Sequence, residues 1–221
     1  MMMVQLNLQI NAMEREMNKP ILIAICGKSA AGKDSLAKEL TRVLVYHDIP
    51  CKKLLSDTTR PRRINEVQDI DYHFITEYEF KHNIALERYI ECSYFHRWYY
   101  GINKFQIDKD KINVGVFNPI GLRQLEELQH LYDIIVVYID IPFKERLRRS
   151  INRENRFKLE FLRRGVNDHH DFKDIESYIQ NYFRHYEIFK HRKNVVLMAY
   201  SIYFDIRNKF GMQDIVAGKK V

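Results

Sequence analysis

A glycine-rich loop between an apolar segment and a helix-like segment is the feature that most constrains this fold. Its sequence is Gly27-Lys28-Ser29-Ala30-Ala31-Gly32-Lys33. The preceding run 20–26 has the β-branched content of a buried strand, and apolar residues recur at helical spacing over 35–46. Glycines permit the tight turn, the N–H groups between them can face phosphate oxygens, and the helix adds its positive N-terminal end. The pattern predicts a phosphate-binding loop, with Lys33 as the cation for the outer phosphates of a nucleoside triphosphate.

The residue after the loop lysine departs from the usual pattern. Loops of this type place Ser or Thr there, whose hydroxyl ligates Mg²⁺. This chain has Asp34 followed by Ser35. An aspartate can hold Mg²⁺ through an anionic oxygen. The alternative is that Asp34 is a first-turn acid favoured by the helix dipole, with Ser35 or water taking the metal. Both interpretations stay open, and both predict a magnesium-dependent site.

Length and composition fit one globular enzyme domain. At 221 residues and 46% hydrophobic, the chain can bury a full core without a disulfide or metal staple. No apolar run approaches the roughly 20 residues of a membrane span, and no secretory signal is visible. We therefore expect a cytoplasmic protein with no membrane partner. The cysteines are odd in number and scattered, and are expected to be reduced: Cys26, Cys51 and Cys92.

The positive charge of the chain is unevenly distributed. The net charge is +7, and the excess is concentrated at 60–63 and 144–164. Clustered basic charge can bind nucleic acid, but a small polyanionic substrate explains two local clusters at least as well. No recognition-helix or RNA-stacking signature is present. We therefore expect no nucleic-acid partner.

Strand-like and helix-like segments alternate along the rest of the chain. This alternation predicts an α/β fold, with a parallel sheet core flanked by helices. Further strands are expected at 51–56, 71–76, 89–95, 113–117, 133–140 and 194–198. Helices are expected at 77–83, 120–131, 142–155, 178–190 and 201–210.

A second motif lies downstream of the phosphate loop. The run Ser56-Asp57-Thr58-Thr59-Arg60-Pro61-Arg62-Arg63-Ile64-Asn65-Glu66 is followed by Asp71-Tyr72-His73-Phe74, then by Glu91 and Tyr99-Tyr100-Gly101. Here residues 21–140 resemble the guanylate kinase family, which carries Ser-x-Thr-Thr-Arg-x-x-Arg-x-x-Glu, Asp-Tyr-x-Phe, a Glu and Tyr-Gly in this order. The resemblance implies a P-loop NTPase fold and an ATP- and Mg²⁺-dependent nucleoside monophosphate kinase, with GMP or dGMP the favoured acceptor.

The resemblance also implies a domain plan and residue roles. It implies an N-terminal extension over 1–19, a core over 20–56 and 112–221, an acceptor-binding insertion over 57–111 and a lid at about 150–173. ATP would be bound by the phosphate loop with Asp34 and Ser35. The acceptor phosphate would be held by Arg60, Arg63, Tyr72 and Tyr100, beside Gly101. Ser56 and Glu91 would face the acceptor base, and Glu66 would orient the arginines. A monomer or homodimer is expected.

Residue chemistry supports this assignment independently. Arginine forks match phosphate oxygens bidentately and keep their charge. A carboxylate at Glu91 could accept hydrogen bonds from the N1–H and amino groups of guanine, whereas adenine offers an acceptor there. The simpler interpretations are a solvated basic turn at 60–63 and a surface acid at Glu91.

Three positions depart from the family pattern. Ile102 stands where a small hydroxyl usually helps to read the base, and Val116 and Asn118 stand where acids usually end a strand. These departures, with Gly-Lys-Asp-Ser-Leu at 32–36, resemble the ribose 1,5-bisphosphate phosphokinases of the same superfamily. A kinase for another phosphorylated acceptor is therefore one alternative. A catalytically silent binding module is another, although such modules typically lose the loop lysine and glycines that are intact here.

An arginine-rich segment after Pro142 fits a lid. Arg146, Arg149 and Arg153 are spaced so that one helix face can present them together. Such a face would neutralise charge during phosphoryl transfer, with Lys33 and Arg60 as the other catalytic cations. The pair 163–164 and the acids at 168, 171 and 174 would complete the lid or form surface salt bridges. Aromatic packing and solvated positions are expected for His96, Trp98 and the pair 169–170.

Overall fold

The larger of two sheets is entirely parallel. The computed structural model describes residues 19–64, 66–153, 158–190 and 194–210, with the side chains of 152–164 excepted. The sheet has five strands in the order β2-β7-β1-β8-β9, and every neighbouring pair is parallel. Its strands are β1 (Ile21–Gly27), β2 (Cys51–Lys53), β7 (Ile112–Phe117), β8 (Asp133–Asp140) and β9 (His185–Lys190). This arrangement confirms the predicted α/β fold.

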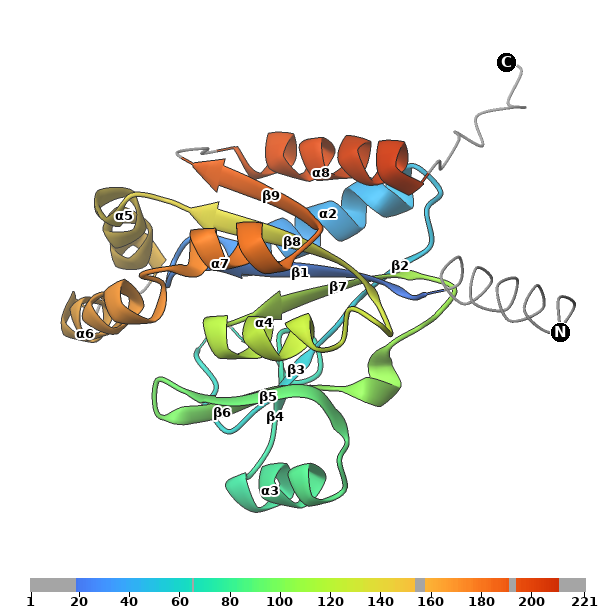
Figure 1. The fold of residues 1–221 in the computed structure, drawn as a ribbon. Helices are drawn as coiled ribbons and strands as arrows, with labels where there is room; N and C mark the ends of the chain where they lie inside the picture. Colours follow the sequence, from blue (N-terminus) through green and yellow to red (C-terminus); the bar gives the residue numbers. More distant parts are fainter. Residues whose placement is uncertain (1–18, 65, 154–157, 191–193, 211–221) are drawn as a thin grey trace, which may run out of the picture.

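Strand alternation divides the core into two layers. In β1, Leu22 and Ala24 pack into one cluster while Ile23 and Ile25 pack into the other. Strands buried on both faces read as continuous apolar runs, which is why β1 and β8 are recognisable from sequence. Helices α2 (Lys33–Tyr46) and α8 (Val195–Phe210) cover one face, and α4 (Pro119–Glu126) and α7 (Ile175–Tyr182) cover the other (Figure 1).

A second, smaller sheet lies below the core in Figure 1. It has four strands in the order β4-β3-β6-β5. These are β3 (Ser56–Thr58), β4 (His73–Phe74), β5 (Tyr89–Phe95) and β6 (Trp98–Asn103). Helix α3 (Glu77–Ala85) packs on this sheet through the buried Phe80 and begins at a capping box between Thr76 and Glu79. A short 3₁₀ helix, Lys104–Gln106, leads back to the larger sheet.

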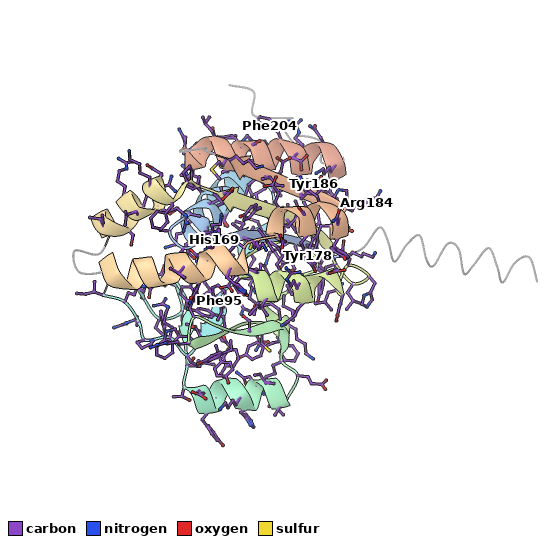
Figure 2. The ribbon with its side chains drawn as sticks, turned by 60° about the vertical axis from the view of Figure 1, so that its left-hand side comes forward. Phe95, His169, Tyr178, Arg184, Tyr186 and Phe204 are labelled. Carbon is purple, nitrogen blue, oxygen red and sulfur yellow. The ribbon has the colours of Figure 1, made fainter. Side chains whose placement is uncertain are left out.

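The two charged helices lie beyond the carboxyl ends of the parallel strands. These are α5 (Phe143–Arg153) and α6 (Lys158–Asp171), and both are at the end of the sheet where β1 enters the phosphate loop (Figure 1). Figure 2 shows α6 above the smaller sheet, with Phe95 at their junction. Ligands of open parallel sheets bind at this end. Among the described residues, no helix combines the length and apolar character that crossing a bilayer would need.

Two predictions near the C-terminus were wrong. The predicted helix 178–190 ends at Tyr182, and 185–190 is strand β9, because these residues pair in parallel with β8. The predicted strand 194–198 is instead the start of α8. The Asn194 side chain accepts hydrogen bonds from the N–H groups of Val196 and Leu197 and so caps the helix. An apolar β-branched run does not distinguish a strand from a buried helix.

The other differences concern element boundaries. The predicted strand 51–56 is two strands, β2 and β3, in different sheets, and the predicted strand 71–76 is reduced to β4. The predicted helix 120–131 ends earlier, at Glu126. Strand β6 was not predicted. It follows a tight turn in which His96 and Arg97 have φ of 51° and 75°, a conformation that a sequence without Gly or Asn does not signal.

Candidate active site

The phosphate loop joins β1 to α2 by a turn that needs its two glycines. A Cβ at Gly27 would stand 2.7 Å from the carbonyl oxygen of Ile139, so only glycine lets β1 pass this close to β8. Gly32 has a φ of 101°, which L-residues rarely adopt. The loop closes through a hydrogen bond of 3.1 Å from the Ala31 N–H to the Lys28 carbonyl. This turn leads directly into the N-terminus of α2, the arrangement that binds anions in loops of this type.

Two lysines extend from this loop in different directions. The Lys33 ammonium donates to the carbonyl oxygens of Gly27 and Lys28, at 2.6 and 3.3 Å, so it folds back over the loop. The Lys28 ammonium donates to Asp140 at the end of β8, at 3.1 Å. Lys33 also lines the cavity that faces the smaller sheet (the site cavity), whereas Lys28 lines a separate cavity behind the loop. Of these two lysines, Lys33 is the one placed toward a ligand.

The site cavity lies between the phosphate loop, the smaller sheet, α5 and α6. It brings together predicted residues of both halves of the site, from the loop at one end to the smaller sheet at the other. The predicted residues that line it are Gly27, Ser29, Ala30, Lys33, Asp34, Ser56, Arg60, Arg63, Tyr72, Glu91 and Tyr100.

Arg60 and Arg63 are held by one buried carboxylate. Glu66 Oε1 accepts from Arg60 at 2.9 Å and from Arg63 at 3.4 Å, and its Oε2 accepts from the Arg63 N–H at 3.0 Å. The Arg60 guanidinium also lies 5.3 Å from the ring centre of Tyr72. Arg60 is only 7% exposed, and Glu66 is buried behind the cavity wall. Burial and rigid contacts pre-orient these guanidinium groups for an anion in the cavity.

The register of the smaller sheet places predicted base-facing residues in one row. Ser56 pairs with Ile102, and Ile102 pairs in turn with Glu91, so these three side chains share a face. The cavity is on this face. Gly101 is on the opposite face, where a Cβ would stand 3.1 Å from the ring of Phe80. Its lack of a side chain makes room for packing under the sheet and does not open the cavity.

Glu91 is a buried carboxylate at the end of the cavity. It is 4% exposed, and among the described residues its Oε2 has no hydrogen-bond partner. Burial raises the pKa of Glu91 to about 8, which a hydrogen bond from the Ile102 backbone only partly offsets. A buried acceptor without a partner costs about 1 to 3 kcal/mol. This cost is recovered if a ligand donates to the carboxylate.

Asp34 faces the acceptor half of the cavity. Its carboxylate is the main reason that the pKa of Tyr72 is raised, together with burial of the phenol. Ser35 is exposed and lines a different cavity, on the α5 side of the loop. Among the described residues no cluster of three metal-ligating side chains exists. A metal held at Asp34 would need further oxygen ligands from phosphate and water.

Asn118 lies near this point but is engaged in local structure. Its Oδ1 accepts from the Gly121 N–H at 2.9 Å and so caps α4, while its amide donates to the buried Ser93 hydroxyl. Val116 lines the same cavity wall. Neither residue supplies the acid that related chains were expected to carry at this strand end.

The two predicted lid arginines with described side chains, Arg146 and Arg149, lie around the loop but do not line the site cavity. Arg146 donates to the carbonyl oxygens of Ser29 and Ile141, at 3.0 and 3.1 Å. Arg149 donates to the Ala31 carbonyl at 2.9 Å and lines the second cavity beside Ser35. The side chain of Arg153 is outside the described part of the structure. Both described arginines thus hold loop carbonyls from different sides.

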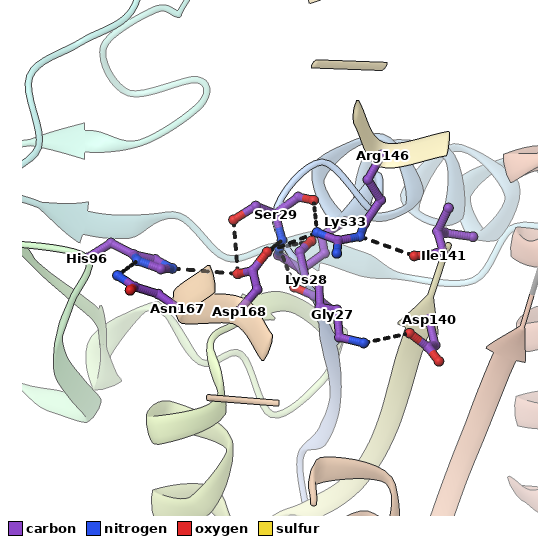
Figure 3. A network of polar contacts seen from close by, with 10 residues as sticks. All are labelled: Gly27, Lys28, Ser29, Lys33, His96, Asp140, Ile141, Arg146, Asn167 and Asp168. Carbon is purple, nitrogen blue, oxygen red and sulfur yellow. Dashed lines mark hydrogen bonds and ion pairs between the residues drawn. The ribbon is translucent and has the colours of Figure 1, made fainter. Parts of the chain in front are cut away.

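Two residues missed as site residues complete the region. Asp168 is 1% exposed, and its carboxylate accepts from the Ser29 N–H at 2.9 Å and from Arg146 at 3.0 Å (Figure 3). Of the two roles expected for Asp168, a surface salt bridge is therefore wrong, because the carboxylate is buried. Burial acts to raise the pKa of Asp168, but His96, the Ser29 N–H, Lys33 and Arg146 outweigh it and lower the pKa. His96 lines the cavity beside Asp168. No motif in the sequence marks either residue.

The parallel sheet, the loop at the end of β1 and the cavity beyond the strand ends define a P-loop nucleotide-binding fold. The guanylate kinase family profile matches residues 17–189. The chain belongs to the guanylate kinase family.

Individual relatives agree with this membership. The chain is 39% identical over 137 residues to the guanylate kinase of Clostridium perfringens strain 13, a match covering 61% of each chain. It is 30% identical over 160 residues to that of Helicobacter pylori strain ATCC 700392, covering 71% of this chain and 76% of the relative. The chain thus spans about three fifths of the length of the first of these relatives. The guanylate kinase structure from Anaplasma phagocytophilum is similar in fold, with a TM-score of 0.60 and 17% identity over 89% of this chain and 88% of that one.

Proposed function

We propose that this protein transfers the terminal phosphoryl group of ATP to GMP or dGMP, giving the diphosphate. The observation that carries the proposal is the buried carboxylate of Glu91, whose Oε2 lacks a partner among the described residues, in the same cavity as Lys33 and Arg60. Guanine offers two adjacent N–H donors to such a carboxylate, whereas adenine offers an acceptor that would leave it unpaired.

The donor would be bound at the phosphate loop. The loop N–H groups other than those of Ser29 and Ala31, which donate to Asp168 and to the Lys28 carbonyl, would cradle the phosphates. Lys33 would exchange its contacts with the loop carbonyls for phosphate oxygens. Asp34 and Ser35 are the residues that would hold Mg²⁺, with Asp34 the better placed because it faces the cavity. The metal would neutralise charge on the phosphates.

The acceptor would be bound at the smaller sheet. Arg60 and Arg63 would fork onto the oxygens of its phosphate, with hydroxyl groups from Tyr72 and Tyr100 as further donors. Ser56 and Glu91 would face the base. Because this phosphate would lie between the arginines and Lys33, its oxygen could attack the terminal phosphorus of ATP in line. Arg146, Arg149 and Arg153 would stabilise the charge that develops there.

The negative charge of Glu91, in the row of residues that would face the base, argues against ribose 1,5-bisphosphate as acceptor. Asp34 and Asn118 resemble the sugar-phosphate kinases, but Glu91 lines the cavity that would have to take both phosphates of such an acceptor. A buried carboxylate repels that phosphate. A silent binding module fits less well, since Lys33 and both loop glycines are present. A cytoplasmic location and a monomeric or homodimeric state are part of this proposal.

A coupled ADP-release assay with a panel of acceptors tests the proposal. The panel contains GMP, dGMP, AMP, CMP, UMP and ribose 1,5-bisphosphate, each with ATP and Mg²⁺. We expect GMP and dGMP to be preferred, Lys33→Ala to lower kcat by orders of magnitude, and Glu91→Gln to lower kcat/KM for GMP more than tenfold. A preference for another acceptor would refute the guanine assignment, and full turnover by Lys33→Ala would refute the donor site.

A further inference from the structure

Asp168 is the point at which three parts of the structure meet. It comes from α6, its Oδ2 accepts from the phosphate loop through the Ser29 N–H, and the same oxygen accepts from Arg146 of α5. Its Oδ1 accepts from the Ser29 hydroxyl at 3.1 Å. The position of this carboxylate therefore determines how the Ser29 peptide and Arg146 are held (Figure 3).

The smaller sheet reaches Asp168 through His96. This residue is in the tight turn between β5 and β6, and its side chain is 9% exposed. Its Nδ1 lies 3.3 Å from Asn167 Nδ2, which can only donate, so Nδ1 accepts and the ring proton is on Nε2. Nε2 is 3.6 Å from Asp168 Oδ1, and among the described residues it has no hydrogen-bond partner.

The gap between these two atoms is small. A hydrogen bond of this type spans about 2.7 to 3.2 Å, so a shift of roughly half an ångström would complete it. The turn that carries His96 continues into β5 and β6, which also carry Glu91 and Tyr100 along the cavity. An acceptor bound to this face would contact β5 and β6, and a shift of these strands toward it would move His96.

We propose that His96 and Asp168 are positioning residues that couple acceptor binding at the smaller sheet to nucleotide binding at the phosphate loop. Closure of the hairpin on its ligand brings His96 Nε2 into hydrogen-bond range of Asp168. The added hydrogen bond fixes Asp168, which already holds the Ser29 peptide and Arg146 beside the triphosphate site. This inference rests on the proposed function, since it takes GMP as the ligand of the smaller sheet and ATP as the ligand of the loop.

Calorimetric titration of the full chain measures this coupling directly. The dissociation constant of a non-hydrolysable ATP analogue with Mg²⁺ is determined with and without saturating GMP, and the ratio of the two constants is the coupling factor. We expect a factor of about five or more for the unaltered protein. In His96→Ala it should fall close to one.

Three further variants separate coupling from loss of local structure. Arg97→Ala is the matched control, because Arg97 is exposed and shares the same positive-φ turn, and it should keep the coupling factor. His96→Gln restores a donor near the position of Nε2 and should recover part of the coupling. Asn167→Ala removes the amide that orients the ring, and should lower the factor even if His96→Ala does not fold.

The outcomes distinguish this inference from the proposed function. If both ligands bind and the coupling factor is the same in His96→Ala as in the unaltered protein, or is one throughout, the inference is refuted and the proposed function stands. If GMP does not bind at all, the proposed function fails and this inference fails with it.

Discussion

Gly121 and Glu91 are adjacent across the cavity wall, with the first turn of α4 packed against the carboxylate. A Cβ at Gly121 would stand 3.0 Å from the carboxyl carbon of Glu91 and closer still to Oε2. Glycine is usually a poor choice in a helix, since it costs about 0.5 to 1 kcal/mol relative to alanine. Here it leaves the space that the Glu91 carboxylate occupies.

Gly121→Ala should therefore destabilise the protein, although alanine has the higher helix propensity. We expect it to displace the Glu91 carboxylate, lower the free energy of unfolding by about 1 to 3 kcal/mol, and raise KM for GMP while leaving KM for ATP nearly unchanged. Thermal unfolding and steady-state kinetics measure these effects. Ile120→Ala, at the exposed neighbouring position, is the control. A more stable Gly121→Ala protein with normal GMP kinetics would contradict the packing argument.

The raised pKa of Glu91 predicts a pH dependence of acceptor binding. With a pKa of about 8 the buried carboxyl is mostly protonated at pH 7, and only the carboxylate accepts both guanine N–H groups. The affinity for GMP should thus rise roughly eightfold between pH 7 and pH 8.5, with release of a proton on binding. Calorimetry in buffers of different ionisation enthalpy measures both quantities. Glu91→Gln should remove this slope, and an unchanged slope would assign it to another group.

The same group affects the stability of the ligand-free protein. Its folded pKa is raised above the ordinary value of 4.5, so the folded state binds the proton more tightly than the unfolded state. Its contribution to stability is complete below pH 4.5 and is lost as pH rises toward 8. Saturating GMP should oppose this loss, and the comparison of Tm with and without GMP across that range checks the sign.

Substitutions of Asp34 and of Ser35 should have different effects on the Mg²⁺ dependence of the rate. If Asp34 holds Mg²⁺, Asp34→Asn should raise the Mg²⁺ concentration for half-maximal rate at least tenfold, with a smaller change in KM for ATP at saturating metal. Ser35→Ala should then change the metal dependence little, because Ser35 lines the other cavity. Titration of Mg²⁺ at fixed ATP gives both values. The reverse ranking would assign the metal to Ser35 and leave Asp34 as a helix-start residue.

Arg60 should contribute more to the stability and to acceptor binding of the protein than its neighbours in the same loop do. Its guanidinium is 7% exposed and shares Glu66 with Arg63, which is more exposed at 27%. Removing it leaves a buried carboxylate with fewer partners, a change that typically costs about 2 to 5 kcal/mol. We expect Arg60→Ala to lower Tm and to weaken every acceptor similarly, whatever its base. Arg62→Ala, at an exposed position, is the matched control, and equal effects of the two variants would rule out the proposed role.

Local sequence determined the phosphate loop, the strands β1 and β8, and the arginine loop, because short-range sterics and hydrophobic periodicity specify each of them. It did not determine the edge strand β9 or the start of α8. The run 195–198 suits a strand or a buried helix, and the capping contact of Asn194 selects the helix. Residues 185–190 form the edge strand because they pair with β8. The hairpin strand β6 was missed because its turn relies on strained residues that carry no turn signal.

The candidate site divides in the same way. The positions of Lys33 and Arg60 on the cavity could be predicted from their spacing, because each belongs to one contiguous motif. The contacts between Glu91 and Gly121, and between His96 and Asp168, join residues distant in the chain. Only the register of the smaller sheet and the packing of α4 and α6 bring them together, because burial and hydrogen-bond partners are properties of the folded state.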